Sequence, residues 1–87
     1  MKVEDIKRVI EESIEGSTAI ILDPMNDGQH LQAFVVSPVF ENLPLVRQHQ
    51  MVMKPLKQAF DGNALHAMAL KTFTPERWRE VRDQYGI

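Results

Sequence analysis

The beginning of the chain has the period of an amphipathic helix. Apolar side chains recur at intervals of three and four positions, at Val3, Ile6, Val9, Ile10 and Ile14. The charged residues between them fall elsewhere on the helical turn, so this segment is predicted to bury one face. A glycine at position 16 follows, and its conformational freedom suits the end of a helix.

Two short apolar runs come next, and both have the composition of β-strands. The first covers residues 19–22, and the second covers residues 30–37. Between them, Asp27 and Gly28 form a pair that is typical of tight connections. The pattern therefore predicts two antiparallel strands, with His30 at the start of the second.

A longer amphipathic helix is predicted in the middle of the chain. Pro38 ends the preceding strand, and residues 40–42 make a short connection with room for one extra turn. The predicted apolar stripe consists of Leu45, Val46, His49, Val52, Met53, Leu56 and Phe60. Residues 61–63, with the sequence Asp-Gly-Asn, are expected to stop the helix.

The last strand and the last helix are predicted from one continuous run. Residues 67–72 alternate in the period-two pattern of an extended segment, and His66 stands at the start of that strand. Thr74 can accept a hydrogen bond from a free helix N–H, and Pro75 suits the first helical position. The strand is therefore expected to lead directly into a helix. His66 is either a buried structural histidine or part of a site.

The order of these elements is α, β, β, α, β, α. We expect an α+β sandwich in which a three-stranded sheet carries its helices on one face. The length of 87 residues predicts a single domain over residues 1–87. Its core is expected to contain Val9, Ile10, Val35, Val52, Leu56 and Phe60, with Trp78 as a core or interface anchor.

The composition argues against some classes of function but does not identify one. A net charge of −2 argues against a general nucleic-acid binder, for which a strongly basic footprint is expected. Because the chain has no cysteine, histidine and carboxylate side chains are its only good metal donors. No apolar run is long enough to span a bilayer and no secretory leader is visible, which predicts a cytoplasmic location. No catalytic motif stands out, and an enzyme is not expected.

Several of these segments together resemble the BolA family, from about Val3 to Trp78. The resemblance is carried by Ser37-Pro38-Val39-Phe40-Glu41, by Val46, His49 and Val52, and by His66-Ala67 with Lys71-Thr72-Phe73-Thr74-Pro75-Glu76-Arg77-Trp78. It implies a fold similar to the class II KH domain, α-β-β-α-α-β-α. It also implies that the protein forms a heterodimer with a monothiol glutaredoxin. The two proteins would share one [2Fe-2S] cluster, with glutathione as a further ligand.

The resemblance also assigns ligands. It implies that His66 is a metal ligand and that His30 is the second, as in the family members with a histidine in this loop. His49 is more simply a packing residue, with a third ligand or a partner contact as the alternative. Histidine in place of a thiolate on one iron raises the potential of such a cluster, as in Rieske centres.

A KH-like nucleic-acid-binding transcriptional regulator is the alternative function. Basic residues that could contact a partner or nucleic acid are Arg47, Lys54, Lys57, Lys71 and Arg77. Two features weaken this alternative: the chain has Gln48 and Gln50 where the family often has arginines, and it lacks the Gly-x-x-Gly loop of KH modules. A weak homodimer is a further alternative assembly.

Overall fold

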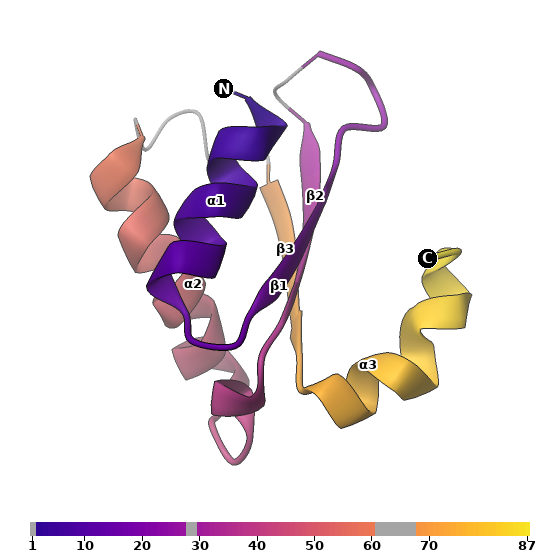
Figure 1. Ribbon diagram of the computed structural model, residues 1–87. Coiled ribbons are helices and arrows are strands. Elements are labelled where there is room, and N and C mark those ends of the chain that lie inside the picture. Colours follow the sequence, from indigo (N-terminus) through magenta and orange to yellow (C-terminus); the bar gives the residue numbers. More distant parts are fainter. Residues whose placement is uncertain (1, 28–29, 61–67) are drawn as a thin grey trace.

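The computed structural model describes residues 2–27, 30–60 and 68–87 (Figure 1). Its elements follow the predicted order, including one extra turn before the long helix. They are α1 (Val3–Ser13), β1 (Thr18–Leu22), β2 (Leu31–Val36), the 3-10 turn η1 (Pro38–Phe40), α2 (Leu45–Ala59), β3 (Met68–Phe73), α3 (Pro75–Val81) and the 3-10 turn η3 (Arg82–Tyr85). Within these residues, no helix is long and apolar enough to cross a bilayer.

The three strands form one mixed sheet in the order β1-β2-β3. β1 and β2 are antiparallel, as predicted, with Thr18 opposite Val36. β2 and β3 are parallel, with Leu31 beside Met68. A parallel pair needs a long crossover connection, and α2 lies in that connection.

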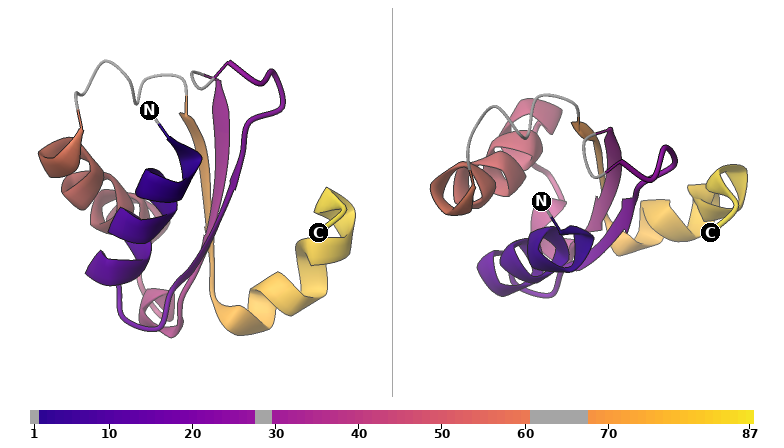
Figure 2. Two further views of the ribbon diagram at one scale, coloured as in Figure 1. Left: turned by 45° about the horizontal axis from the view of Figure 1, so that its top comes forward. Right: turned by 90° about the horizontal axis from the view of Figure 1, so that it is seen from above.

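The main core lies between the sheet and the helices α1 and α2, which cover the same face (Figure 2). Its buried members are Ile6, Ile10, Ile14, Ala19, Leu31, Val35, Phe40, Val52 and Leu56. Val9 and Phe60 are partly buried and pack against this group. The predicted core is therefore confirmed, because the three-and-four spacing places these side chains on the inner faces of both helices.

The predicted stripe of α2 is wrong in its first turn. Val52 and Leu56 are fully buried, whereas Leu45 and Val46 are 62% and 63% exposed. β3 is an outer strand, so no strand of the described sheet lies beyond it for this turn to cover.

The expectation that all helices share one face is also wrong. α3 lies on the opposite face of the sheet from α1 and α2 (Figures 1 and 2). Neighbouring side chains of a strand point to opposite faces, so Phe34 turns toward α3 while Val35 turns toward the main core. The second core consists of Phe34, Val36, Trp78 and Val81, with Ile20, Phe73, Tyr85 and Ile87 packed around them. Trp78 is thus a core residue.

The predicted helix boundaries have the expected local chemistry. Thr74 caps α3, because its Oγ1 accepts a hydrogen bond from the N–H of Arg77 at 3.3 Å, and Pro75 takes the first position. Gly16 has a φ of +66° after α1, in the left-handed region that favours glycine. Asn42 has a φ of +65° in the turn before α2, which asparagine adopts more readily than most residues.

Candidate metal centre

The candidate metal centre lies at one end of the sheet, which we call the rim and define as the end at which β2 and β3 both begin. Because these strands are parallel and Leu31 lies beside Met68, the segments that precede them arrive at the same end. The rim is at the top of Figure 1. In the sequence, His30 stands directly before Leu31, and His66 stands two positions before Met68.

Two aspartates shape the loop before β2. Asp23 accepts a hydrogen bond at its Oδ1 from the N–H of Asp27, at 3.2 Å. Asn26, between them, has a φ of +54°. Asp27 in turn accepts a hydrogen bond at its Oδ1 from the N–H of His30, at 3.0 Å. These side-chain acceptors fix the backbone of the loop in the way that aspartate commonly does in turns.

The imidazole of His30 is oriented by Asp27. Its Nδ1 lies 2.7 Å from Asp27 Oδ2, and its side chain is 58% exposed. When Nδ1 carries the proton and donates it to this carboxylate, Nε2 keeps the lone pair that can bind a metal. A carboxylate behind a metal-binding histidine fixes the orientation of its ring. His30 therefore has the surroundings of a solvent-facing metal ligand.

His66, which is predicted as the other ligand, lies outside the described residues. Among residues 2–27, 30–60 and 68–87, no group of three or more histidine, aspartate and glutamate side chains could hold a metal ion.

His49 lies far from His30 along the sheet. It is half-buried on α2 and faces a hollow beside Leu70, Thr72 and Tyr85. The residue before it, Gln48, accepts a hydrogen bond from Thr72 Oγ1 at 2.6 Å. Thr72 is four positions beyond Met68, or roughly 13 Å along the strand. The structure therefore places His49 beside the later residues of β3, away from the rim. Its role as a packing residue, a third ligand or a partner contact stays a prediction.

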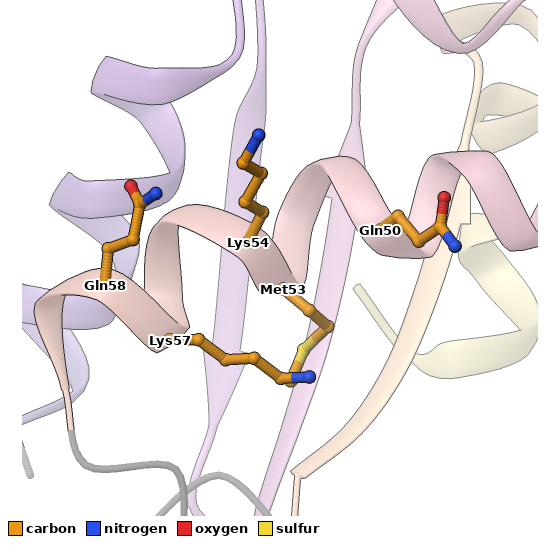
Figure 3. Close-up of a pocket in the computed structure, with 5 residues that line it drawn as sticks. All are labelled: Gln50, Met53, Lys54, Lys57 and Gln58. Carbon is orange, nitrogen blue, oxygen red and sulfur yellow. The ribbon is translucent and has the colours of Figure 1, made fainter.

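Two of the predicted basic contacts, Lys54 and Lys57, line a hollow of about 460 Å³ along α2. Figure 3 shows Lys54 and Gln58 on one side of the helix, and Met53 and Lys57 on the other. Among the described residues, only α2 lines this hollow. It is an open surface with two ammonium groups.

The other three basic residues are dispersed. Arg47 is exposed on α2, and Arg77 pairs with Glu80 at 3.0 Å on α3. Lys71 extends from β3 and places its Nζ 5.2 Å from the centre of the Tyr85 ring. Because α2 and α3 lie on opposite faces, these side chains do not form a continuous basic patch of the kind that phosphate backbones require.

Sequence reasoning missed the role of Asp27. Its signal was present, because an aspartate three positions before a histidine can reach both the backbone N–H and the ring of that residue. The same residue was interpreted only as part of a tight connection. The contact turns a loop histidine into an oriented one.

Comparisons with known proteins agree with the resemblance seen in the sequence. A family model for BolA-like proteins matches residues 6–77, which is most of the chain. The chain therefore belongs to the BolA family. Its α+β fold also matches solved BolA structures: a bolA protein homologue from Coxiella burnetii has a TM-score of 0.74 at 31% identity, over 91% of this chain and 97% of that one.

Two curated relatives carry functional names. The acid stress protein IbaG of Escherichia coli strain K12 is 33% identical over 61 residues, which is 70% of this chain and 73% of that protein. The DNA-binding transcriptional regulator BolA of Haemophilus influenzae is 36% identical over 50 residues, which is 58% of this chain and 48% of that protein. These names describe a stress protein and a regulator, and neither describes an enzyme.

Proposed function

We propose that this BolA-family protein is a non-enzymatic adaptor that shares a [2Fe-2S] cluster with a monothiol glutaredoxin, in order to transfer the cluster or sense it. The observation that carries the proposal is the rim, where the parallel strands β2 and β3 begin side by side. His30 stands directly before one strand, with its ring held by Asp27. His66 stands two positions before the other.

Simple distances support a pair of ligands at the rim. Neighbouring strands lie about 4.8 Å apart. His66 stands two positions before Met68 in the sequence, and Met68 begins β3. The 58% exposure of the His30 side chain leaves room for a partner to approach.

The donor set fits a shared cluster better than one held by this chain alone. The chain has no cysteine, so it offers neutral imidazoles and no thiolate. The remaining ligands would be a glutaredoxin cysteine and glutathione. When bound, such a cluster supplies one-electron chemistry whose potential is raised by histidine ligation. The role of Asp27 is to accept a hydrogen bond from Nδ1 of His30, which leaves the lone pair on Nε2.

Cluster reconstitution tests the proposal. The protein is mixed with a Cys-Gly-Phe-Ser-type monothiol glutaredoxin, iron, sulfide and glutathione, and visible circular dichroism is recorded. We expect a spectrum distinct from that of the glutaredoxin homodimer. His66→Ala should abolish it without unfolding the domain, and His30→Ala should leave a weaker, altered spectrum. His49→Gln is the matched control, because His49 lies away from the rim and should preserve the spectrum.

One further variant and its response to acidification test whether His30 is a ligand. His30→Cys should hold the cluster more tightly and lower its potential, since a thiolate donates more charge than an imidazole. Because protons compete with iron for imidazole, the parent complex should lose its cluster on acidification more readily than the cysteine variant. A native mixed spectrum in His66→Ala would refute the ligand assignment.

The name of the Haemophilus influenzae relative favours a second candidate function, that of a KH-like nucleic-acid-binding transcriptional regulator. The net charge of −2 and the dispersed basic side chains speak against it. Titration of duplex DNA at increasing salt distinguishes the two functions. Submicromolar binding with a steep loss at higher salt would support the regulator, and the absence of binding at physiological salt would exclude it.

A further inference from the structure

β3 has an open backbone edge. Phe73 turns its carbonyl toward β2, because it accepts a hydrogen bond from the N–H of Ser37 at 3.0 Å. Each strand of a parallel pair uses the backbone groups of every second residue toward its neighbour. The N–H and C=O groups of Leu70 and Thr72 therefore point away from β2, and they have no hydrogen-bond partner among the described residues.

The outer edge of β1 is protected at Ala19. This residue donates its N–H to Glu11 Oε2 at 2.9 Å, and its C=O accepts a hydrogen bond from Lys7 Nζ at 2.7 Å. Two side chains of α1 thus occupy the backbone groups at which another strand would pair. Proteins commonly block edge strands in this way. The outer edge of β1 is therefore blocked at Ala19, whereas no described side chain blocks Leu70 or Thr72 on the edge of β3.

A groove lies along the open edge. It has a volume of about 240 Å³ and is lined by Leu45, His49, Leu70, Lys71, Thr72, Phe73 and Tyr85. α2 forms its wall on one side, and Tyr85 lies on the other face of the sheet. A groove between a helix and an unpaired strand edge is the geometry that binds extended peptides by strand addition. It also explains the exposure of Leu45 in the first turn of α2.

Lys71 gives the groove a positive charge. Lys71 is exposed, and its Nζ lies 3.4 Å from the hydroxyl of Tyr85. Among the described residues, no carboxylate forms an ion pair with it. If β3 of a second copy were added antiparallel, the two Lys71 side chains would lie directly or diagonally opposite each other, and such like charges destabilise strand pairing. An acidic segment would pair favourably with the same lysine.

We propose that the open edge of β3 binds an extended, acidic segment of a partner protein by strand addition. In the partner's strand, the residues opposite Leu70 and Thr72 would face α2, and apolar side chains suit this side. The alternate residue faces Lys71, and a carboxylate suits that side. This interaction uses the edge of the sheet, away from His30, and does not depend on a bound cluster.

Nuclear magnetic resonance with a synthetic peptide tests the inference. The probe is a capped eight-residue peptide that alternates valine and glutamate, added to the 15N-labelled protein. The amide protons of Leu70 and Thr72 should become protected from exchange, while the amides of β1 stay unchanged. The same peptide with alternate backbone nitrogens methylated should not bind, because it cannot donate the strand hydrogen bonds. Equal binding of the methylated peptide would overturn the proposal.

Charge reversal provides the matched pair of variants. Lys71→Glu should weaken binding of the acidic peptide by roughly fivefold and favour a valine–lysine peptide instead. Lys57→Glu changes the net charge equally but lies on α2 outside the groove, so it should leave the affinity within roughly twofold. The spectra of both variants verify the fold. An unchanged affinity in Lys71→Glu, or β3-to-β3 contacts between two copies in place of peptide binding, would refute the proposed partner.

Discussion

The two faces of the sheet are covered in different ways. On one face, α1 and α2 bury nine residues, most of them aliphatic, and Ile6, Ile10, Val35, Val52 and Leu56 are fully enclosed. On the other, the seven-residue helix α3 and a short turn cover an aromatic group. Its rings come from Phe34, Phe73, Trp78 and Tyr85, with centroids 5.0 to 6.2 Å apart.

The difference shows how a small domain can close both faces with little chain. An aromatic side chain buries about 150–250 Å², so a few rings cover an area that needs a second helix when the side chains are aliphatic. The aromatic group is shallower, because Trp78 is still 8% exposed whereas Leu56 is not exposed at all. A shallow group can relax after a substitution, and an enclosed one leaves a cavity.

The largest effect is expected on the aliphatic face. Leu56→Ala should lower the free energy of unfolding by about 2–5 kcal/mol, because it removes a fully buried side chain and leaves a cavity. Urea denaturation measures the change as a shift of the midpoint at constant slope. Leu45→Ala is the control on the same helix, since this side chain is 62% exposed and should cost about 0.5 kcal/mol or less. Equal costs would show that the burial of α2 is wrongly assigned.

A smaller effect is expected on the aromatic face. Phe34→Leu should cost about 1–2 kcal/mol, because it loses ring contacts with Trp78 and Tyr85 at centroid distances of 5.7 and 5.0 Å but keeps an apolar side chain. Thermal unfolding followed by near-ultraviolet circular dichroism measures both the stability and the ring packing. A cost as large as that of Leu56→Ala would contradict the view that this face relaxes.

Glu11 joins α1 to β1 by hydrogen bonds, and its contribution to the stability of the protein should depend on pH. The hydrogen bond from Lys7 and the one from the N–H of Ala19 lower the pKa of Glu11 below its ordinary value of 4.5. Because the folded protein holds this carboxylate with fewer protons than the unfolded chain does, its contribution is present above pH 4.5 and is lost as the pH falls through the lowered value.

Glu11→Gln should therefore reduce stability by about 1 kcal/mol at pH 7, and the difference from the parent should shrink below pH 4.5. Denaturation midpoints at several pH values measure this. Glu12→Gln is the matched control, because Glu12 is exposed and makes no hydrogen bond within the described part of the chain. A pH-independent difference would mean that packing, and not the carboxylate, ties α1 to the strand.

The smallest effect on stability is expected for the contact between Tyr85 and Lys71 on the aromatic face. Tyr85→Phe removes the hydroxyl that lies 3.4 Å from Lys71 Nζ but keeps the ring beneath the ammonium. Its cost should be about 0.5 kcal/mol or less, because the contact is exposed and the ring packing is retained. Urea denaturation is sufficient to measure it. A loss above 1 kcal/mol would assign the hydroxyl a structural role.

The aliphatic face could be predicted from the sequence, and the aromatic face could not. Val52 and Leu56 stand four positions apart and lie on the same buried face of α2, which is a local signal that the sequence shows. α3 is only two turns long, and the rings it covers come from segments far apart in the sequence. No local period connects Phe34 with Tyr85. Its position on the second face depends on tertiary packing alone.

The candidate site could also be predicted only in part. The position of His30 at the start of β2 followed from the strand pattern. The parallel pairing that brings the start of β3 beside it is a matter of strand order, which local patterns do not encode. The contact with Asp27 was missed because loop side chains were interpreted by turn propensity, without considering their hydrogen-bond acceptors.

The parallel pairing of β2 and β3 also makes the rim a late product of folding. Leu22 pairs with Gln32, ten positions on, whereas Leu31 pairs with Met68, 37 positions on. Closing the longer loop costs about 1 kcal/mol more in chain entropy, so the β1–β2 hairpin is expected to form first. In the proposed site, donors at the rim would therefore meet only when β3 has docked. By mass action, a ligand that bridges them would stabilise this last step, and the complete fold would itself be the condition for loading.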